Sequence, residues 1–351
     1  MRRVHLFNAD NDGALAVNRA SYTPPAMAGA LERDLALLPA VWAAPGDYII
    51  APAGTALPAW MMERGMRIYH GEADAEVAEP WGWSLNARLR LRRAGVPEGL
   101  LPDDEELERH REQSHRRTAM LLARGLEAEG IASPNRPVEI TSAEELRALM
   151  AGGHRLMVKR PWSCSGRGVF PLAHLSEQRA AELAEGIIRR QGSVMVERML
   201  DRKADFSAIL HSDGRSVKLR GWTLFQTSAE GRYEGTLIAP QELIGERIEA
   251  LGADTRRLGA ALERNLSPLI AGYCGWLSVD MLATTDGEIA PCIEVNLRRT
   301  MGVVALDIAE QMPLGEPPML MSVRGASEPL RADERVITGG ESFRLSLTAT
   351  D

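Results

Sequence analysis

The first hundred residues alternate short apolar runs with stretches of helical periodicity. The predicted strands cover residues 4–7, 47–51 and 66–69, and the predicted helices cover residues 27–38 and 57–64. Strands that alternate with helices are typical of a parallel sheet with helices on its faces. The pattern therefore predicts a small α/β domain. The polar loop at residues 8–13 follows the first strand, at the edge where open sheets of this kind bind ligands.

The chain then passes through an irregular to helical bridge at residues 80–102 into one long predicted helix at 103–129. The helix starts with acidic residues, which suit the positive end of the helix dipole. It stops at a Gly-Ile-Ala-Ser-Pro turn, residues 130–134. A further helix at 143–150 leads into a strand at 155–160.

The last part of the sequence is rich in strands. Its predicted elements are strands at residues 193–197, 205–211, 216–225, 275–283, 288–295 and 342–348, and a helix at 255–270. Runs of strands with separate helices indicate an α+β arrangement. We therefore predict an α/β domain at residues 1–110, followed by a two-lobed α+β unit with lobes at 111–198 and 199–351.

Composition places the chain among ordinary globular proteins and limits its partners. Of 351 residues, 45% are hydrophobic and 25% are charged, and the formal net charge is −7. This balance argues against a general binder of nucleic acids or anionic membranes, although it does not exclude a local basic groove. The cysteines Cys164, Cys274 and Cys292 lack CxxC spacing, which favours a reducing compartment. The apolar runs are shorter than the roughly 20 residues of a membrane span, so we predict a cytoplasmic protein.

The first region with candidate chemistry centres on Lys159. Only three of the 41 basic residues are lysines, which indicates that a lysine is kept where a compact ammonium is needed. Lys159 ends a predicted strand, and the loop after it contains Ser165, Gly166 and Gly168. Such a loop lets backbone N–H groups converge on a phosphate, while the lysine supplies a point charge. It is not a Gly-Lys-Ser/Thr loop, and an ordinary hairpin with an exposed cation is the alternative.

The second region is a predicted strand that runs into a charged linker, residues 194–200. Its backbone can contact an adenine edge, and Asp205, a few residues on, can accept hydrogen bonds from ribose hydroxyls. A solvated strand end is the alternative.

The third region combines two predicted strands and the turn between them. Asp280 lies on the first strand, and after a turn at residues 284–287 the second strand carries Glu294, Asn296 and Arg298. Alternation with a period of two puts these three side chains on one face, and Asp280 joins them if the strands pair. Carboxylate and amide oxygens suit Mg²⁺ held beside phosphates. Without a cation, a buried set of this kind leaves charges unpaired, which favours a bound metal. A polar outer face of the sheet is the alternative.

Taken in order along residues 110–305, these regions resemble the ATP-grasp superfamily. The resemblance lies in a lysine followed by a Ser/Gly loop, a strand that ends in Glu197, and an Asp…Glu-x-Asn set on late strands. The turn at residues 130–134 resembles the segment after that fold's first central helix. The first hundred residues are similar to the pre-ATP-grasp domain of such enzymes. The implied fold is an α/β pre-ATP-grasp domain followed by a two-lobed α+β ATP-grasp unit.

The resemblance also implies a role for each candidate residue. The implied nucleotide contacts are Lys159 at the α/β-phosphates, Ser165, Gly166 and Gly168 in the phosphate lid, Glu197 and the backbone of Arg198 to Leu200 at adenine, and Asp205 at the ribose. The implied Mg²⁺ ligands are Asp280, Glu294 and Asn296. Arg298 matches the arginine that supports the transferred phosphoryl group or the oxyanion.

Two positions depart from the family pattern. The family has an earlier phosphate-contacting Lys or Arg near the start of this unit, where Arg116 and Arg117 are both candidates. The position two before the metal aspartate, often arginine in the family, is Ser278. The positive charge of the family's arginine would then be supplied by Lys218, Arg220 or Arg299.

The activity implied by the resemblance is an ATP-dependent ligation. The γ-phosphoryl group of ATP activates a small carboxylate as an acyl phosphate, an amine or thiol attacks, and ADP and phosphate leave. The loop residues Asn8, Asp10, Asn11 and Asp12 are candidates for binding the amine substrate, or they form a turn and a helix N-cap. The alternatives to a ligase are a non-catalytic ATP-binding regulatory protein and a kinase. The sequence leaves open whether the chain forms a homodimer.

Overall fold

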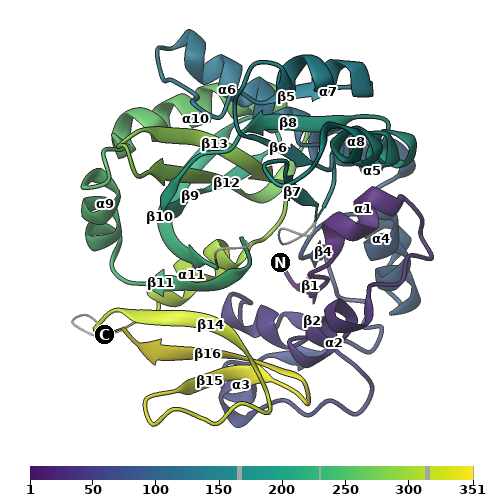
Figure 1. Cartoon of the computed structure of the whole chain (residues 1–351). Coiled ribbons are helices and arrows are strands. Elements are labelled where there is room, and N and C mark those ends of the chain that lie inside the picture. Colours follow the sequence, from purple (N-terminus) through teal and green to yellow (C-terminus); the bar gives the residue numbers. More distant parts are fainter. Residues whose placement is uncertain (164–167, 229–230, 313–316, 351) are drawn as a thin grey trace. The chain divides into compact units, whose positions relative to one another are not determined.

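The computed structural model describes residues 1–163, 168–228, 231–312 and 317–350 (Figure 1). The helices are α1 (Asn11–Val17), α2 (Ala26–Asp34), α3 (Ala59–Glu63), α4 (Leu85–Arg93), α5 (Asp104–Gln113), α6 (Arg117–Ala128), α7 (Ala143–Met150), α8 (Glu177–Gln191), α9 (Gln241–Glu249), α10 (Thr255–Leu269) and α11 (Met301–Ala309), with 3₁₀ turns at Leu38–Val41 and Glu98–Leu100. The strands are β1 (Arg3–Leu6), β2 (Tyr48–Ile50), β3 (Arg67–Ile68), β4 (Val77–Pro80), β5 (Val138–Ile140), β6 (Leu156–Lys159), β7 (Val169–Pro171), β8 (Val194–Arg198), β9 (Arg202–Asp213), β10 (Val217–Thr227), β11 (Tyr233–Ile238), β12 (Cys274–Thr284), β13 (Ile289–Asn296), β14 (Met319–Gly325), β15 (Arg335–Gly339) and β16 (Phe343–Ala349). Within these ranges no helix has both the length and the apolar character needed to cross a membrane.

The chain divides into two compact units, and each is built from segments that are distant in the sequence. Unit 1 comprises Met1–Arg111, Glu234–Pro240 and Arg298–Asp351. Unit 2 comprises Glu112–Tyr233 and Gln241–Leu297. The sequence placed residues 199–351 in a single lobe, whereas the structure groups their last part with unit 1. The division into three parts stays a prediction.

Unit 1 begins with a parallel sheet in the order β3-β2-β1-β4, which confirms the predicted α/β architecture. The predicted strands at 4–7, 47–51 and 66–69 correspond to β1, β2 and β3. The fourth strand, β4, was missed, because its four residues end in a proline at the start of the predicted bridge. It pairs in parallel with β1, which therefore lies inside the sheet.

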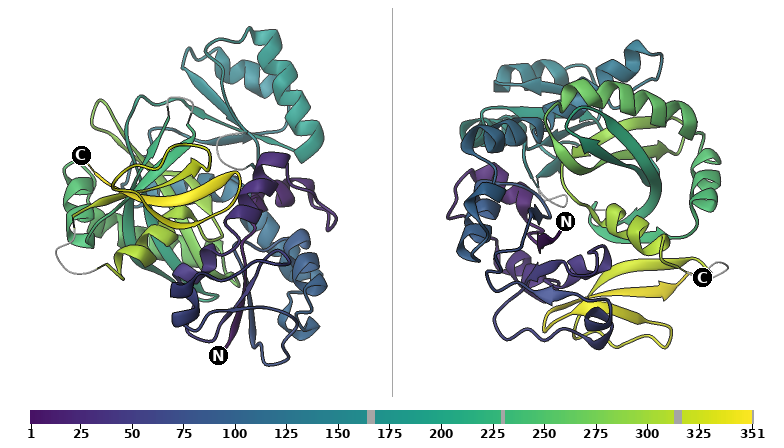
Figure 2. Two further views of the ribbon diagram at one scale, coloured as in Figure 1. Left: turned by 90° about the horizontal axis from the view of Figure 1, so that it is seen from below. Right: turned by 180° about the vertical axis from the view of Figure 1, so that it is seen from behind.

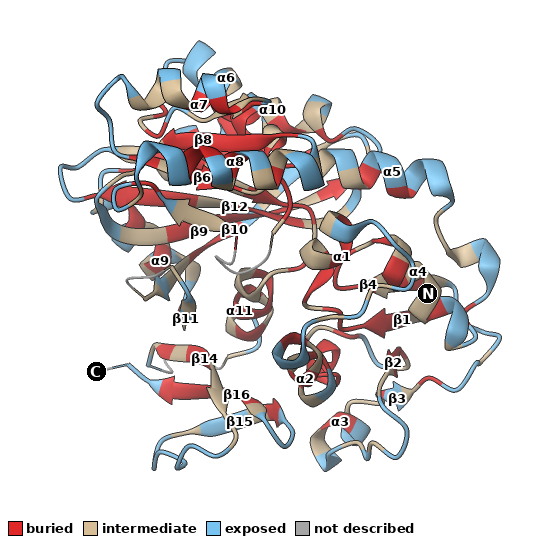
Figure 3. Ribbon diagram, turned by 45° about the vertical axis from the view of Figure 1, so that its right-hand side comes forward, coloured by how far each residue is buried: buried red, intermediate tan, exposed pale blue. Residues whose placement is uncertain are grey.

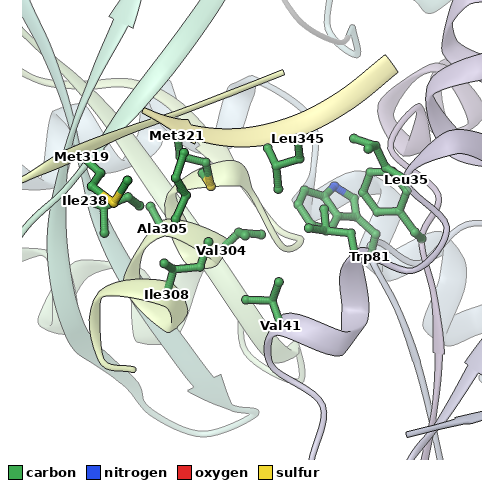
Figure 4. Packing of buried hydrophobic residues seen from close by; sticks show 13 residues of the cluster. Leu35, Val41, Trp81, Ile238, Val304, Ala305, Ile308, Met319, Met321 and Leu345 are labelled. Atoms are coloured by element: carbon green, nitrogen blue, oxygen red, sulfur yellow. The ribbon is translucent and has the colours of Figure 1, made fainter. Parts of the chain in front are cut away.

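The C-terminal strands of unit 1 form an antiparallel array in the order β11-β14-β16-β15. Asp34 at the end of α2 accepts backbone hydrogen bonds from Ser342 and Phe343, so the last strand is fastened to the N-terminal part. Between them lies a buried apolar cluster that includes Leu35, Trp81 and Leu345 (Figure 4). The cluster explains why residues at both ends of the chain belong to one unit.

Unit 2 contains a small antiparallel sheet in the order β5-β8-β6-β7, covered by α7 and α8 (Figure 2). Leu146 of α7 and Ala184 of α8 pack against Val158 and Val196 of the sheet. Figure 3 shows α8 with exposed residues on its outer side above buried strands. This packing fixes β6, whose last residue is Lys159, next to β8, which carries Glu197.

The larger sheet of unit 2 runs β13-β12-β9-β10 and has two chemically different faces. The register pairs Met281 with Phe206 on one face and Asp280 with Ser207 on the other, since paired residues in an antiparallel sheet point the same way. Helix α10 packs on the apolar face, where its Gly259 lies against the side chain of Leu219. The polar face is thus left to Asp280 and its neighbours. The observed α/β and α+β elements match the predicted fold class.

The long helix predicted at residues 103–129 is wrong in one respect, because it is broken into α5 and α6. At the break, the Thr118 hydroxyl donates to the carbonyl of Gln113, and His115 Nδ1 accepts from the N–H of Arg117. These local bonds compete with the helical ladder. As a result, Arg116 becomes the residue that precedes α6.

Candidate active site

Lys159 and Glu197 form a buried ion pair between neighbouring strands. They are 5% and 9% exposed, and the register sets them diagonally across β6 and β8. Asn135 donates a second hydrogen bond to Glu197, from Nδ2 to Oε2 at 3.2 Å, and also bonds the carbonyl of Cys292. Asn135 was missed by the sequence-based reasoning, which considered only the turn just before it. The pair holds the ammonium of Lys159 at a fixed place at the end of its strand.

The loop after Lys159 begins at Arg160 and is closed at its other end by Gly168. The carbonyl of Gly168 accepts a 2.8 Å hydrogen bond from the N–H of Arg160. A Cβ atom at position 168 would overlap the side chain of Ser163, so this position requires glycine. The proposed lid residues Ser165 and Gly166, together with Cys164, lie outside the described residues. The described ends of the loop therefore form a tight return into β7.

The two predicted metal-binding carboxylates face each other across β12 and β13. The register pairs Asp280 directly with Glu294, and Ser278 with Asn296. Asp280 accepts hydrogen bonds from Ser207 Oγ at 2.7 Å and from Asn296 Nδ2 at 3.0 Å. The pairing that the turn at residues 284–287 predicted is present. It brings the carboxylates and the amide to one face of the sheet.

Arg116 lies at this same place, whereas its neighbour Arg117 does not. Arg116 Nη2 donates to Glu294 Oε1 at 2.6 Å, and Nη1 donates to Ser163 Oγ at 2.7 Å. Arg117 instead binds Glu139 through Nε and Nη2, and this contact lowers the pKa of Glu139 to about 2. Of the two arginines that the sequence left open, Arg116 is the one that joins the loop to the carboxylates.

Cys292 lies on β13 two residues before Glu294, and Asn135 joins its carbonyl to the carboxylate of Glu197. Burial raises the pKa of Cys292, and the negative charges of Glu197, Asp280 and Glu294 raise it further. The positive charge of Lys159 acts on the same thiol and lowers its pKa. One small side chain therefore lies within electrostatic reach of the Lys159 pair and of both carboxylates on β12 and β13.

Arg298 departs from its predicted position. The sequence placed it on the same strand face as Glu294 and Asn296, but β13 ends at Asn296 and Arg298 lies in the following loop of unit 1. Its guanidinium binds both carboxylate oxygens of Asp12, with Nη2 to Oδ2 at 2.7 Å. These contacts, and the hydrogen bond from the next backbone N–H to Trp81, draw the chain away from the sheet. Its predicted role at the phosphoryl group stays a prediction.

The polar loop after β1 forms a turn and the start of α1 rather than an open set of side chains. Asp10 precedes the helix without a side-chain capping bond, and its carboxylate accepts from the hydroxyl of Tyr22. Asn8 donates to Asn11 and to the carbonyl of Gly82. The loop side chains are thus held within unit 1, and their binding of an amine substrate stays a prediction.

The remaining nucleotide candidates lie on or near the strands of unit 2. The backbone N–H of Arg198 donates to Asn135, and Asp205 accepts from Thr227 Oγ1 at 2.6 Å. Burial raises the pKa of Asp205. No described contact places Leu200. Lys218 is not brought together with these residues, because it pairs with Glu263 of α10 and is exposed.

The other two candidates for the redistributed charge have contacts or exposure of their own. Arg299 is held in unit 1 by Glu79 at 2.7 Å and Asp307 at 3.3 Å, while Arg220 is exposed on β10. Their compensation for the arginine that Ser278 replaces stays a prediction.

The oxygen donors on β12 and β13 fit a magnesium ion. Mg²⁺ is usually bound through one or two carboxylates, with phosphates and water completing its shell. Asp280 and Glu294 supply those carboxylates, and Asn296 adds an amide. Among the described residues, no group of three or more His, Cys, Asp or Glu side chains is placed to hold a metal ion by itself. Two carboxylates and one amide suit an Mg²⁺ ion whose shell is completed by phosphate and water.

Solved structures share this fold, although their sequences are remote. The chain is similar to N5-carboxyaminoimidazole ribonucleotide synthetase from Thermus thermophilus, at 14% identity and a TM-score of 0.56, over 99% of this chain and 93% of that one. It is similar to a biotin carboxylase–β-γ-ATP complex from Campylobacter jejuni, at 11% identity and a TM-score of 0.55, over 99% and 86%. It is also similar to the biotin carboxylase domain of 2-oxoglutarate carboxylase from Hydrogenobacter thermophilus, in complex with MgADP, ADP and bicarbonate, at 12% identity and a TM-score of 0.52, over 79% and 70%.

These likenesses show the fold alone, and that fold agrees with the one implied by the resemblance of the sequence to the ATP-grasp superfamily. No family model matches the chain, and no curated protein is significantly similar to it in sequence.

Proposed function

We propose that this chain is an ATP-dependent ligase that joins a small carboxylate to an amine or thiol and releases ADP and phosphate. The observation that carries the proposal is the contact of Arg116, which joins Glu294 to the loop after Lys159, while Glu294 directly faces Asp280. We call the facing carboxylates Asp280 and Glu294, with Asn296, the metal edge. A fixed cation beside this proposed metal edge is suited to a bound triphosphate. The ATP-grasp fold supports the same assignment.

In the proposed reaction, a carboxylate oxygen of the substrate attacks the γ-phosphorus of ATP, and the bond to the ADP oxygen breaks. The resulting acyl phosphate is attacked at its carbonyl carbon by the amine or thiol, whose proton is lost as phosphate leaves. The chain supplies no covalent nucleophile. Its task is to hold the groups in line and to neutralise the charge that develops at the phosphoryl group and the oxyanion.

Particular side chains fit particular parts of that task. Lys159, fixed by Glu197, would hold the α/β-phosphates, and the return at Gly168 would bring backbone N–H groups over them. The residues proposed for the adenosine part are Glu197, the backbone of Arg198 to Leu200, and Asp205.

Asp280, Glu294 and Asn296 would hold a magnesium ion, which supplies positive charge beside the phosphates when bound. Arg298, oriented by its paired contact with Asp12, would stabilise the oxyanion. Ser165, Gly166 and Lys218 stay predicted nucleotide contacts.

The first test needs no knowledge of the substrates. We expect ATP with Mg²⁺ to raise the melting temperature of the wild-type protein and ATP with EDTA to raise it far less. Glu294→Gln should lose the Mg²⁺-dependent part of the shift. Glu129→Gln is the matched control, because Glu129 makes the same kind of contact with Arg264 on the surface. An equal shift with and without Mg²⁺ would contradict the proposed metal edge.

The second test identifies the reaction. ADP release is measured across pools of small carboxylates combined with pools of amines and thiols, with hydroxylamine present in parallel. A hydroxamate formed from one carboxylate supports an acyl phosphate. Phosphate transfer to a hydroxyl would favour a kinase, and a thermal shift without turnover on any pool would favour a non-catalytic ATP binder.

A further inference from the structure

The side chain of Arg116 joins two parts of unit 2 that the proposed function assigns to different tasks. Its guanidinium donates to the carboxylate of Glu294 on β13 at 2.6 Å, to the hydroxyl of Ser163 at 2.7 Å, and to the carbonyl of Arg160 at 2.9 Å. Its backbone N–H donates to the carbonyl of Pro161 at 3.1 Å. The residue before α6 is therefore fastened by main chain and side chain to the start of the phosphate loop and to the metal edge.

The guanidinium is buried, but its hydrogen-bonding capacity is not used up. Arg116 is 7% exposed, and its Nε atom has no hydrogen-bond partner among the described residues. An arginine side chain offers five N–H donors, and a buried donor without an acceptor lowers stability. The arginine is thus held by its charged contact with Glu294 and its bonds to the loop, and it keeps a donor for a further acceptor.

The charge on the facing carboxylates explains why a cation is held there. Asp280 and Glu294 lie directly opposite each other across two antiparallel strands. Like charges at that position destabilise a sheet unless a cation compensates them. One guanidinium supplies a single positive charge, whereas a divalent cation supplies two. A divalent cation therefore matches the two carboxylates better than Arg116 does.

We propose that Arg116 is a placeholder cation: it occupies Glu294 while the metal edge is empty, and it must release Glu294 when a divalent cation binds. The inference rests on the proposed function, since it takes Asp280 and Glu294 as the metal-binding pair. Release of Glu294 frees donors of the guanidinium beside Ser163, at the start of the loop proposed to cover the phosphates. Arrival of the metal would thereby make the arginine available to a phosphate oxygen.

The test measures the binding of Mn²⁺ to the full chain without nucleotide, by electron paramagnetic resonance of the free ion. We expect Arg116→Met to bind Mn²⁺ at least fivefold more tightly than wild type, because the competing guanidinium is gone. Arg117→Met is the matched control: the neighbouring arginine undergoes the same change, but its partner is Glu139. Arg117→Met should leave the affinity for Mn²⁺ within twofold of wild type. Arg116→Gln is the second variant if Arg116→Met does not fold.

The possible results separate this inference from the function on which it rests. If Mn²⁺ binds to wild type and is lost in Glu294→Gln, but Arg116→Met binds it equally or more weakly, the placeholder role is wrong while the metal edge stands. If Glu294→Gln binds Mn²⁺ like wild type, the assignment of Glu294 as a metal ligand is wrong, and the placeholder role of Arg116 is wrong as well. Tighter binding in the Arg116 variant, abolished by adding Glu294→Gln, supports both the placeholder role and the metal edge.

Discussion

Replacing Lys159 by methionine tests whether the ion pair with Glu197 is a true buried pair. Methionine keeps much of the apolar stem of lysine but removes the ammonium. The carboxylate of Glu197, 9% exposed, would be left with the 3.2 Å hydrogen bond from Asn135 as its remaining described side-chain contact. An uncompensated buried charge is strongly unfavourable, so the variant should be less stable than wild type even though its core packing is nearly unchanged.

The magnitude follows from the burial of both partners. Removing one member of a buried pair costs about 3–5 kcal/mol. Because Glu197 keeps a hydrogen bond and slight exposure, we expect the lower end, about 3 kcal/mol. For a unit of this size that corresponds to a fall in melting temperature of about 6–12 °C. The double variant Lys159→Met/Glu197→Gln carries no buried charge at either position and should recover most of the loss.

The assay is urea unfolding of the nucleotide-free protein, followed by circular dichroism. Lys218→Met is the matched control, since it makes the same chemical change where the lysine side chain is 66% exposed and pairs with Glu263. A surface pair of this kind is worth about 0–1 kcal/mol. The reasoning is refuted if Lys159→Met costs no more than Lys218→Met, or if the double variant is less stable than both single variants.

Three further changes probe other parts of the molecule. Gly168→Ala adds a Cβ that overlaps Ser163; we expect about 1–3 kcal/mol lower stability and weaker ATP binding by calorimetry, and an unchanged affinity would show that the loop return is not used. Asp12→Asn breaks the charged contact with Arg298 and should cost about 2 kcal/mol in urea unfolding, whereas a neutral result would mean that the pair is solvated. Burial lowers the pKa of His110 from 6.5 to about 4, so between these pH values the unfolded chain binds more protons and stability falls as the pH drops. Unfolding of His110→Gln at several pH values should show a shallower loss of stability. An equal loss would mean that other groups cause the pH dependence.

The pairing of Asp280 with Glu294 was predictable because its signals are local. The segment around Asp280 and the one around Glu294 both alternate with a period of two, and the turn at residues 284–287 is short enough to make them neighbours. Alternation then places side chains on a face without any knowledge of the rest of the fold. The same reasoning could have found Ser207, which lies two residues after Asp205 and turns toward Asp280.

What the sequence could not provide depends on contacts between distant segments. Arg298 continues the alternation, but its contact with Asp12 ends the strand before it. The break before α6 depends on side chains that bond to nearby backbone, a competition that periodicity does not register. Asn135 becomes a neighbour of Glu197 only when β5 and β8 have paired. In each case a tertiary or local bond overrides the pattern along the chain.

The balance of charge at the site links the metal to the nucleotide. Around Cys292, the carboxylates Glu197, Asp280 and Glu294 outnumber the cation Lys159, and Arg116 adds one positive charge through its contact with Glu294. A triphosphate that approaches these residues without a divalent cation meets carboxylates that repel it at short range, and within a partly buried site water screens this repulsion weakly. A divalent cation bound by Asp280 and Glu294 would reverse the sign of the field at the point where the phosphates are proposed to lie. This is the physical reason to expect a large difference between ATP with Mg²⁺ and ATP with EDTA, and it requires no change in the backbone.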